Sequence, residues 1–220
     1  MKLAPFALIA LGLVLAMAGH AWWAWMRLPP DAVIATHFGA DGEPNGWMPK
    51  AQGLLFGPVV GAGLWLLLML LPRISRRPEA MAKAATPYGL AMIGGCAILL
   101  LGQAAIVSRA LGGHLDVTRL MIPGVGVLLA VLGNYMGKVR QNEFMGVRTP
   151  WTLMDAEVWD RTQRFTGRLM LLGGLGLVAI GLIRPDPKAL TPLVLACAVV
   201  PPVSGAIYSW AISKPKQNQG

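Results

Sequence analysis

Residues 51–71 read AQGLLFGPVVGAGLWLLLMLL and contain no Asp, Glu, Lys or Arg. A bilayer core about 30 Å thick is crossed by roughly 20 apolar residues in a helix. Lipid offers no partner to a bare backbone amide, so a stretch of this kind is expected to form a helix that satisfies its own backbone. This segment therefore predicts a membrane-spanning helix.

Five other stretches also lack charged residues. They cover residues 3–26, 84–108, 120–137, 169–183 and 189–213. The stretch at 169–183 is short, but Arg168 and Arg184 flank it and their side chains can reach the two membrane interfaces. Only 13% of the chain is charged, whereas a typical soluble domain has about 25%. We therefore predict an all-α, polytopic membrane protein with six transmembrane helices.

The basic residues predict how these helices are oriented. If the N-terminus lies inside and the spans alternate, thirteen Lys and Arg lie inside and six outside, while the acidic residues divide evenly. An excess of Lys and Arg marks cytoplasmic loops, so both termini are predicted to be cytoplasmic. This also accounts for the net charge of +9 without a nucleic-acid partner. The inner set is Lys2, Arg73, Arg76, Arg77, Lys83, Lys138, Arg140, Arg148, Arg161, Arg164, Arg168, Lys214 and Lys216, and the outer set is Arg27, Lys50, Arg109, Arg119, Arg184 and Lys188.

The first span has features of a secretory signal, with Ala16-Met17-Ala18 as a possible cleavage site. The apolar run nevertheless continues into Trp22, Trp23 and Trp25. Tryptophans gather at the membrane interface of retained helices, so we favour a retained span.

The outer loop, residues 27–50, is rich in turn-forming residues and is predicted to be a compact loop rather than a domain. It places His37, Asp41 and Glu43 within seven residues. Histidine and carboxylates can bind a divalent metal, but this spacing matches no established metal motif. A structural loop is favoured, with metal binding and ligand contact left as alternatives.

Small and polar residues within the spans predict how the helices pack. Gly53, Gly57 and Gly61 place bare backbone on one helix face, and Gly12 and Ala16 repeat this spacing in the first span. Small residues let membrane helices approach closely, so the first two spans are predicted to pack together. Gln103 and Asn134 are expected to form hydrogen bonds between helices. Pro201-Pro202 is expected to kink the last helix or to leave backbone carbonyls without a helical partner, facing a neighbouring helix.

The inner loop, residues 138–168, contains a predicted amphipathic helix near 150–167. Thr149 before Pro150 suits a helix start, and Thr152 with Asp155 offers a competing one. We expect this helix to lie along the inner membrane surface. Its predicted apolar stripe is Met154, Val158, Phe165 and Leu169, with i,i+4 ion pairs Glu157–Arg161 and Asp160–Arg164.

Asn142, Gly146 and Arg148 precede that helix in a segment without helical periodicity. Glycine permits a positive φ there. Arg148 is placed to reach the carboxylate of Asp155 or Asp160, or a carbonyl at a helix end. An ordinary juxtamembrane loop is the alternative.

These two loops resemble known sequences. A segment of the inner loop resembles the signature of the SdpI family. It reads Asn142-Glu-Phe-Met-Gly146-Val-Arg148-Thr149-Pro150-Trp151-Thr152-Leu153, followed by Trp159, Arg164 and Gly167. The outer loop is similar to an uncharacterised domain often found before that signature, at Pro29-Pro30, His37-Phe38, Gly39, Gly42, Pro44-Asn45-Gly46-Trp47 and Lys50.

The resemblance implies a six-span bacterial plasma-membrane protein with a two-span unit at residues 1–83 and an SdpI-like four-span unit at 84–220. From the family's founding member, the resemblance also implies immunity to an external sporulation-delay peptide toxin, and signalling by recruitment of a cytoplasmic repressor. We therefore expect partner-binding residues on both faces of the membrane. The inner set is Asn142, Gly146, Arg148, Thr149, Trp151 and Trp159, and the outer set is His37, Trp47 and Lys50.

Catalysis is not expected. The chain has no recognisable catalytic triad motif, phosphate loop or Cys/His zinc spacing, so we predict neither an enzyme nor a cofactor. The alternative function is a small channel or transporter with a path between glycine-faced helices. Apart from His20 near one end, the predicted spans contain no acid or base, which argues against proton coupling.

Overall fold

The computed structural model describes residues 2–39, 42–183 and 185–213. Asp41, Arg184, Lys214 and Lys216, which entered the predictions above, lie outside the described residues. Six helices are long and apolar enough to cross a membrane, which confirms the predicted all-α membrane architecture. They are α1 (Ala4–Trp25), α2 (Lys50–Leu70), α4 (Ala85–Ala110), α5 (Val117–Met136), α7 (Ala156–Ile183) and α8 (Pro187–Ser213).

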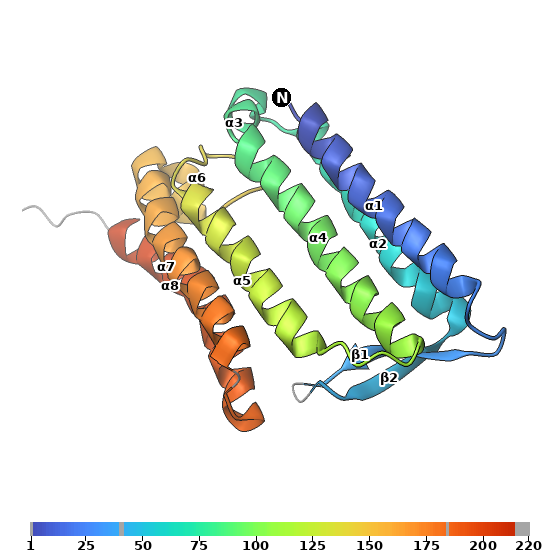
Figure 1. Ribbon diagram of the computed structural model, residues 1–220. Helices are drawn as coiled ribbons and strands as arrows, with labels where there is room; N and C mark the ends of the chain where they lie inside the picture. Colours follow the sequence, from blue (N-terminus) through green and yellow to red (C-terminus); the bar gives the residue numbers. More distant parts are fainter. Residues whose placement is uncertain (1, 40–41, 184, 214–220) are drawn as a thin grey trace, which may run out of the picture.

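The helices form two groups joined at the centre. On one side α1, α2 and α4 pack together, on the other α7 packs against both α5 and α8, and α4 contacts α5 between them (Figure 1). Helix α4, which follows the boundary predicted at residue 83, packs with the first two spans. Short elements at one end are the 3-10 helix η1 (Leu71–Ile74), α3 (Pro78–Lys83) and α6 (Pro150–Met154). We name this the α6 end.

The opposite end, the hairpin end, carries strands β1 (Val33–Phe38) and β2 (Pro44–Pro49). They pair antiparallel, from Val33 opposite Pro49 to Phe38 opposite Pro44, with irregular register around His37. The loop predicted at 27–50 therefore contains a two-stranded sheet. Burying Ile34 fixes the hairpin onto the helices, because this side chain packs with Leu54 of α2 and Ile106 of α4.

Glycines of α2 meet the neighbouring elements as predicted. A Cβ on Gly53 would lie 3.1 Å from Ile34, and one on Gly57 or Gly61 would strike Gln103 or Met17, respectively. The close packing of α1 and α2 is thereby confirmed at Gly61. Gly12, which repeats this spacing in α1, has no such role, since a Cβ there would meet no atom of the described chain within 4 Å.

The amphipathic helix has different bounds from those predicted. Helix α6 ends at Met154, and α7 then runs without a break from Ala156 into the membrane. The break occurs because the Asp155 carboxylate accepts hydrogen bonds from the N–H groups of Glu157 (2.7 Å) and Val158 (3.1 Å), which starts a new helix. Gly167 does not end that helix. It faces Gly133 of α5 instead.

The predicted apolar stripe is also wrong in part. Met154 is 86% exposed, whereas the buried face of α7 carries Thr162, Gln163 and Thr166 beside Val158 and Trp159. The ion pair Glu157–Arg161 is present at 3.5 Å, but the Asp160 carboxylate pairs with Arg140 at 3.3 Å rather than with Arg164. The inner loop folds back over α7 and supplies both the hydrogen-bond partner of Gln163 and this different partner of Asp160.

Candidate functional site

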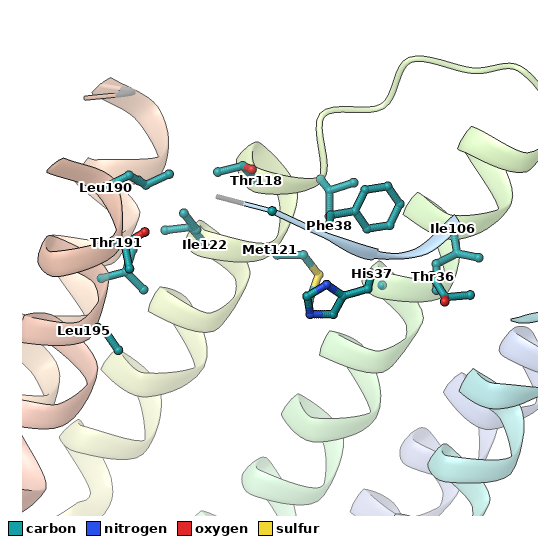
Figure 2. A pocket seen from close by; sticks show the side chains of 14 residues that line it. Thr36, His37, Phe38, Ile106, Thr118, Met121, Ile122, Leu190, Thr191 and Leu195 are labelled. Atoms are coloured by element: carbon teal, nitrogen blue, oxygen red, sulfur yellow. The ribbon is translucent and has the colours of Figure 1, made fainter. Parts of the chain in front are cut away.

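A cavity of about 430 Å³ lies at the hairpin end, between β1 and the helices α4, α5 and α8 (Figure 2). On α5 it is lined by Val117 and Thr118 and, one turn further, by Ile122. On α8 it is lined by Leu190 and Thr191 and, one turn further, by Leu195. The polar side chains of the cavity thus lie near the hairpin, beside apolar ones, and the deeper part is apolar.

His37 brings an imidazole to this cavity. Its Nδ1–H donates a hydrogen bond to the Asn45 side-chain oxygen across the hairpin, since an amide oxygen can only accept. The Nε2 atom is then left as the polar atom available to a ligand. Figure 2 shows the ring turned from β1 toward Met121. The hydrogen bond to Asn45 therefore fixes the orientation of the only ionisable side chain among the described residues that line the cavity.

The other two residues of the predicted outer set differ in exposure. Trp47 on β2 is 58% exposed, on the side of the hairpin opposite the buried Ile34. Lys50 is only 7% exposed. Its ammonium donates to the Leu28 carbonyl at 2.7 Å and lies 4.7 Å from the centre of the Trp25 ring. Lys50 therefore ties the start of α2 to the end of α1, whereas Trp47 is open to a partner.

The described members of the possible metal set have other contacts. The Glu43 carboxylate lies 3.3 Å from the Arg109 guanidinium, and His37 is bonded to Asn45. No group of three or more metal-ligating side chains occurs within the described part of the chain. These contacts support the structural interpretation of this turn.

At the α6 end, Asn142 organises the inner loop from within. It is fully buried, and its side-chain oxygen accepts from the N–H groups of Phe144 and Met145, both at 2.8 Å. Its amide nitrogen donates to the Arg140 carbonyl at 2.7 Å. Asn142 is thus a structural residue of the loop rather than part of its surface.

Helix α7 holds this loop through two side chains. Trp159 is fully buried and donates from Nε1 to the Val139 carbonyl at 2.8 Å. Gln163, also buried, accepts from the Val147 N–H and donates to the Val147 carbonyl, both at 2.9 Å. Gly146 is needed beside them because its φ is +103° and a Cβ there would lie 2.7 Å from the Gln163 oxygen.

Thr149 connects the loop to α6 and α8. It forms the predicted N-cap with Pro150 at the first helical position, in a reciprocal capping box with Thr152. Its hydroxyl also lies 2.9 Å from that of Ser209 in α8. Arg148 and Trp151 remain exposed. The Arg148 guanidinium donates to the Glu143 carbonyl, rather than to either carboxylate considered from the sequence.

Neither Gln163 nor the cavity was predicted from the sequence. Gln163 lies among charged residues of a helix expected to be at the surface, and its partner is a backbone group sixteen residues earlier. The cavity residues come from four elements, and only His37 stood out by its chemistry. The available signal was a Thr followed four residues later by a branched apolar residue, near the start of both α5 and α8.

Comparisons with known proteins agree with the two motif-bearing loops. Residues 138–209 match the SdpI/YfhL protein family, and residues 12–62 match a domain of unknown function, DUF1648. The Immunity protein SdpI of Bacillus subtilis (strain 168) is 30% identical over 98 residues, which are 44% of this chain and 47% of that protein. The chain thus aligns with about half the length of this relative. No solved structure matches the chain.

The family match covers α6, α7 and most of α8, with the loop that Asn142, Trp159 and Gln163 hold in place. The domain of unknown function covers the hairpin and most of the two helices that it joins. The resemblance predicted from the motifs is thus confirmed: this is a multi-pass membrane protein in which a match to a domain of unknown function precedes a match to the SdpI/YfhL protein family.

Proposed function

We propose that this protein confers immunity in a bacterial plasma membrane by binding a membrane-active peptide toxin at the hairpin end. One observation carries the proposal. The face of the hairpin that points away from the helices is apolar, with Val33 68% and Trp47 58% exposed. Exposed apolar surface of this kind marks interaction sites. A peptide that partitions into the membrane interface would meet this face.

The fold supports the same site. Ile34 anchors the hairpin in the core, and Lys50, directly after β2, donates to the Leu28 carbonyl in the segment between α1 and β1. These two side chains hold both strands in place, and a rigid surface loses less conformational entropy on binding. The name of the relative, an immunity protein, supports the choice of a toxin as the partner.

A tolerance assay tests this proposal. The full chain is expressed in Bacillus subtilis cells that lack their own immunity protein, and growth is measured with a panel of secreted membrane-active peptides that includes the sporulation-delay peptide. We expect the chain to raise the inhibitory concentration of at least one peptide. Trp47→Ala should lose this protection because it removes the largest exposed aromatic surface of the hairpin.

Trp22→Ala is the matched control, since Trp22 is 67% exposed at the same end of the bundle but lies on α1. Membrane amounts of all variants are compared by immunoblot. No protection against any peptide at normal expression would refute the proposal. Equal loss in the Trp47 and Trp22 variants would refute the hairpin as the binding surface.

The α6 end is the proposed face for signalling. Its short helix exposes Trp151, Leu153 and Met154 next to Arg148, a mixed apolar and basic surface that suits a protein partner. If this surface recruits a cytoplasmic repressor, Trp151→Ala should abolish the transcriptional response to the toxin while leaving tolerance intact. RNA sequencing of cells that express each variant measures this response, and an unchanged response would refute recruitment through Trp151.

A further inference from the structure

The cavity beneath the hairpin has the polarity of a site for an amphiphile. Its polar side chains, Thr36, His37, Thr118 and Thr191, lie on β1 or near the hairpin end of the bundle, where α5 and α8 both begin. Its deeper walls are apolar and include Ile122 and Leu195, one helical turn further into the bundle (Figure 2). A molecule with one polar end and an apolar chain would match both parts in a single orientation.

The cavity is open on the side of α8, where its lining residue Leu195 is itself exposed. In a membrane this side chain would face lipid. At the back of the cavity, a Cβ on Gly102 would meet no atom of the described residues within 4 Å. The absence of a side chain at Gly102 extends the free space along α4.

We propose that this cavity holds one acyl chain of a bilayer phospholipid, with a headgroup hydroxyl donating to Nε2 of His37 and an ester oxygen accepting from the Thr118 hydroxyl. A methylene needs roughly the volume of a water molecule, about 30 Å³. The cavity volume of about 430 Å³ is therefore close to that of a single chain of ordinary length. The hairpin lies over the polar end of the chain, so β1 serves as a lid on a lipid site.

The polar rim, rather than the apolar walls, must provide the selectivity. A chain that moves from the bilayer into the cavity leaves one apolar environment for another, so it gains little from the hydrophobic effect. The Nε2 atom of His37 can accept from a headgroup hydroxyl, such as those of phosphatidylglycerol, and the hydroxyl of Thr118 can donate to a lipid oxygen. Lipid elsewhere in the membrane lacks these bonds. This inference does not require the immunity function, since the toxin surface proposed above is the opposite face of the hairpin.

Photo-crosslinking tests the site directly. The purified full-length protein is placed in nanodiscs with phosphatidylglycerol that carries a diazirine in its acyl chain, and crosslinked peptides are located by mass spectrometry. We expect labelling of Met121, Ile122 and Leu195 that saturates and is displaced by unlabelled phosphatidylglycerol. General contact with surrounding lipid would instead label the exposed helix faces in proportion to probe concentration, and finding only such labelling would overturn the proposal.

Filling the cavity provides the first pair of matched variants. Ile122→Trp and Leu195→Trp should each lose the saturable labelling, because an indole would occupy the space of the chain. Val127→Trp on α5 and Val199→Trp on α8 are the controls, since both positions are exposed outside the cavity. Saturable labelling that persists in both cavity-filling variants would overturn the site.

The polar contact has its own test. His37→Ala should raise the phospholipid concentration at half-saturation, while His114→Ala, an exposed histidine in the turn between α4 and α5, should leave it unchanged. A free fatty acid with the same diazirine should label the site less tightly than the phospholipid, and tighter labelling would overturn the phospholipid assignment. Trp47→Ala should keep the lipid labelling even where it loses toxin tolerance, which separates failure of the two proposals.

Discussion

Pro58 in the middle of α2 shows how one side chain can repair a gap in a membrane helix. A proline lacks the N–H that would bond the carbonyl four residues earlier, here that of Leu54. In lipid this carbonyl has no water to bond. The amide nitrogen of Gln103, on α4, donates to it at 3.1 Å. Gly57 provides the room, because a Cβ at that position would strike the Gln103 side chain.

Gln103→Leu should therefore destabilise the protein by on the order of 1 kcal/mol, in the range measured for polar contacts between membrane helices. The loss is moderated because the second polar atom, Oε1, has no hydrogen-bond partner among the described residues. The sharper prediction concerns coupling. In a Pro58→Ala background the helix bonds its own Leu54 carbonyl, so Gln103→Leu should cost much less. Unfolding in mixed detergent micelles measures all four proteins, and a cost equal in both backgrounds would contradict this account.

A second carbonyl of α2 is satisfied in the same way. Pro72 in η1 leaves the Leu68 carbonyl without its helical partner, and the Tyr88 hydroxyl donates to it at 2.7 Å. Sequence reasoning identified Gln103 as a hydrogen-bonding residue between helices, and this was confirmed. It also named Asn134, which lies on an exposed face. Gln103 differs from Asn134 because it faces a helix that contains a proline. The sequence does not show which helices face each other, since that depends on how distant segments pack.

Gly146 should not tolerate even a methyl group. Its φ of +103° lies in a region that costs other residues roughly 1–2 kcal/mol. An alanine there would also press on the Gln163 oxygen that bonds Val147. Gly146→Ala should lower the unfolding midpoint and release the loop, detected as faster proteolysis between residues 140 and 149. Gly12→Ala, in an open part of α1, is the control and should be neutral, so equal effects would contradict the prediction.

The pairing of α5 with α7 depends on a line of four glycines rather than on interlocking side chains. A Cβ on Gly133 would lie 2.7 Å from the Gly167 carbonyl oxygen, and one on Gly126 would lie 2.7 Å from that of Gly174. Each helix carries its two glycines seven residues apart, which places them on one face. Such contact between backbones gains stability from close van der Waals packing, the main source of helix association in lipid.

Gly133→Val should therefore force α5 and α7 apart and cost about 2–3 kcal/mol, as overpacking a tight contact does. The measurement is the thermal midpoint of the purified protein in detergent. Gly63→Val is the matched control, because a Cβ on Gly63 meets nothing within 4 Å in the portion of the chain that the structure describes. A smaller loss in Gly133→Val than in the control would show that the glycine contact does not hold the two helices together.

Elements differ in how well their sequence predicts them. The spans were predictable because each needs only local apolar composition, and the N-cap at Thr149 because its signal lies within four residues. The hairpin was not, since Pro44, Asn45 and Gly46 in β2 have low strand propensity and pair only because Ile34 fixes β1 to the helices. The glycine contact between α5 and α7 was not predicted, for a different reason. Among 27 glycines, spacing alone does not show which ones face a partner helix.

For the whole molecule, the two ends differ in kind as well as in charge. Most of the basic residues that the structure describes lie at the α6 end, where three short helices and the inner loop form a compact cap. The hairpin end carries an apolar strand face, a cavity and the tryptophans of α1. The toxin proposal requires this end to face outward, so it depends on the positive-inside interpretation of the sequence.

Cysteine labelling in intact cells checks that orientation. In a background where Cys96 and Cys197 are replaced by Ala, a cysteine at His114, between α4 and α5, should react with a membrane-impermeant maleimide. A cysteine at Ser75, at the α6 end, should react only after the membrane is permeabilised. Both positions lie outside the long helices, so burial in lipid does not explain a difference between them. The reverse pattern would place the hairpin in the cytoplasm, and binding of an external toxin there would be physically impossible.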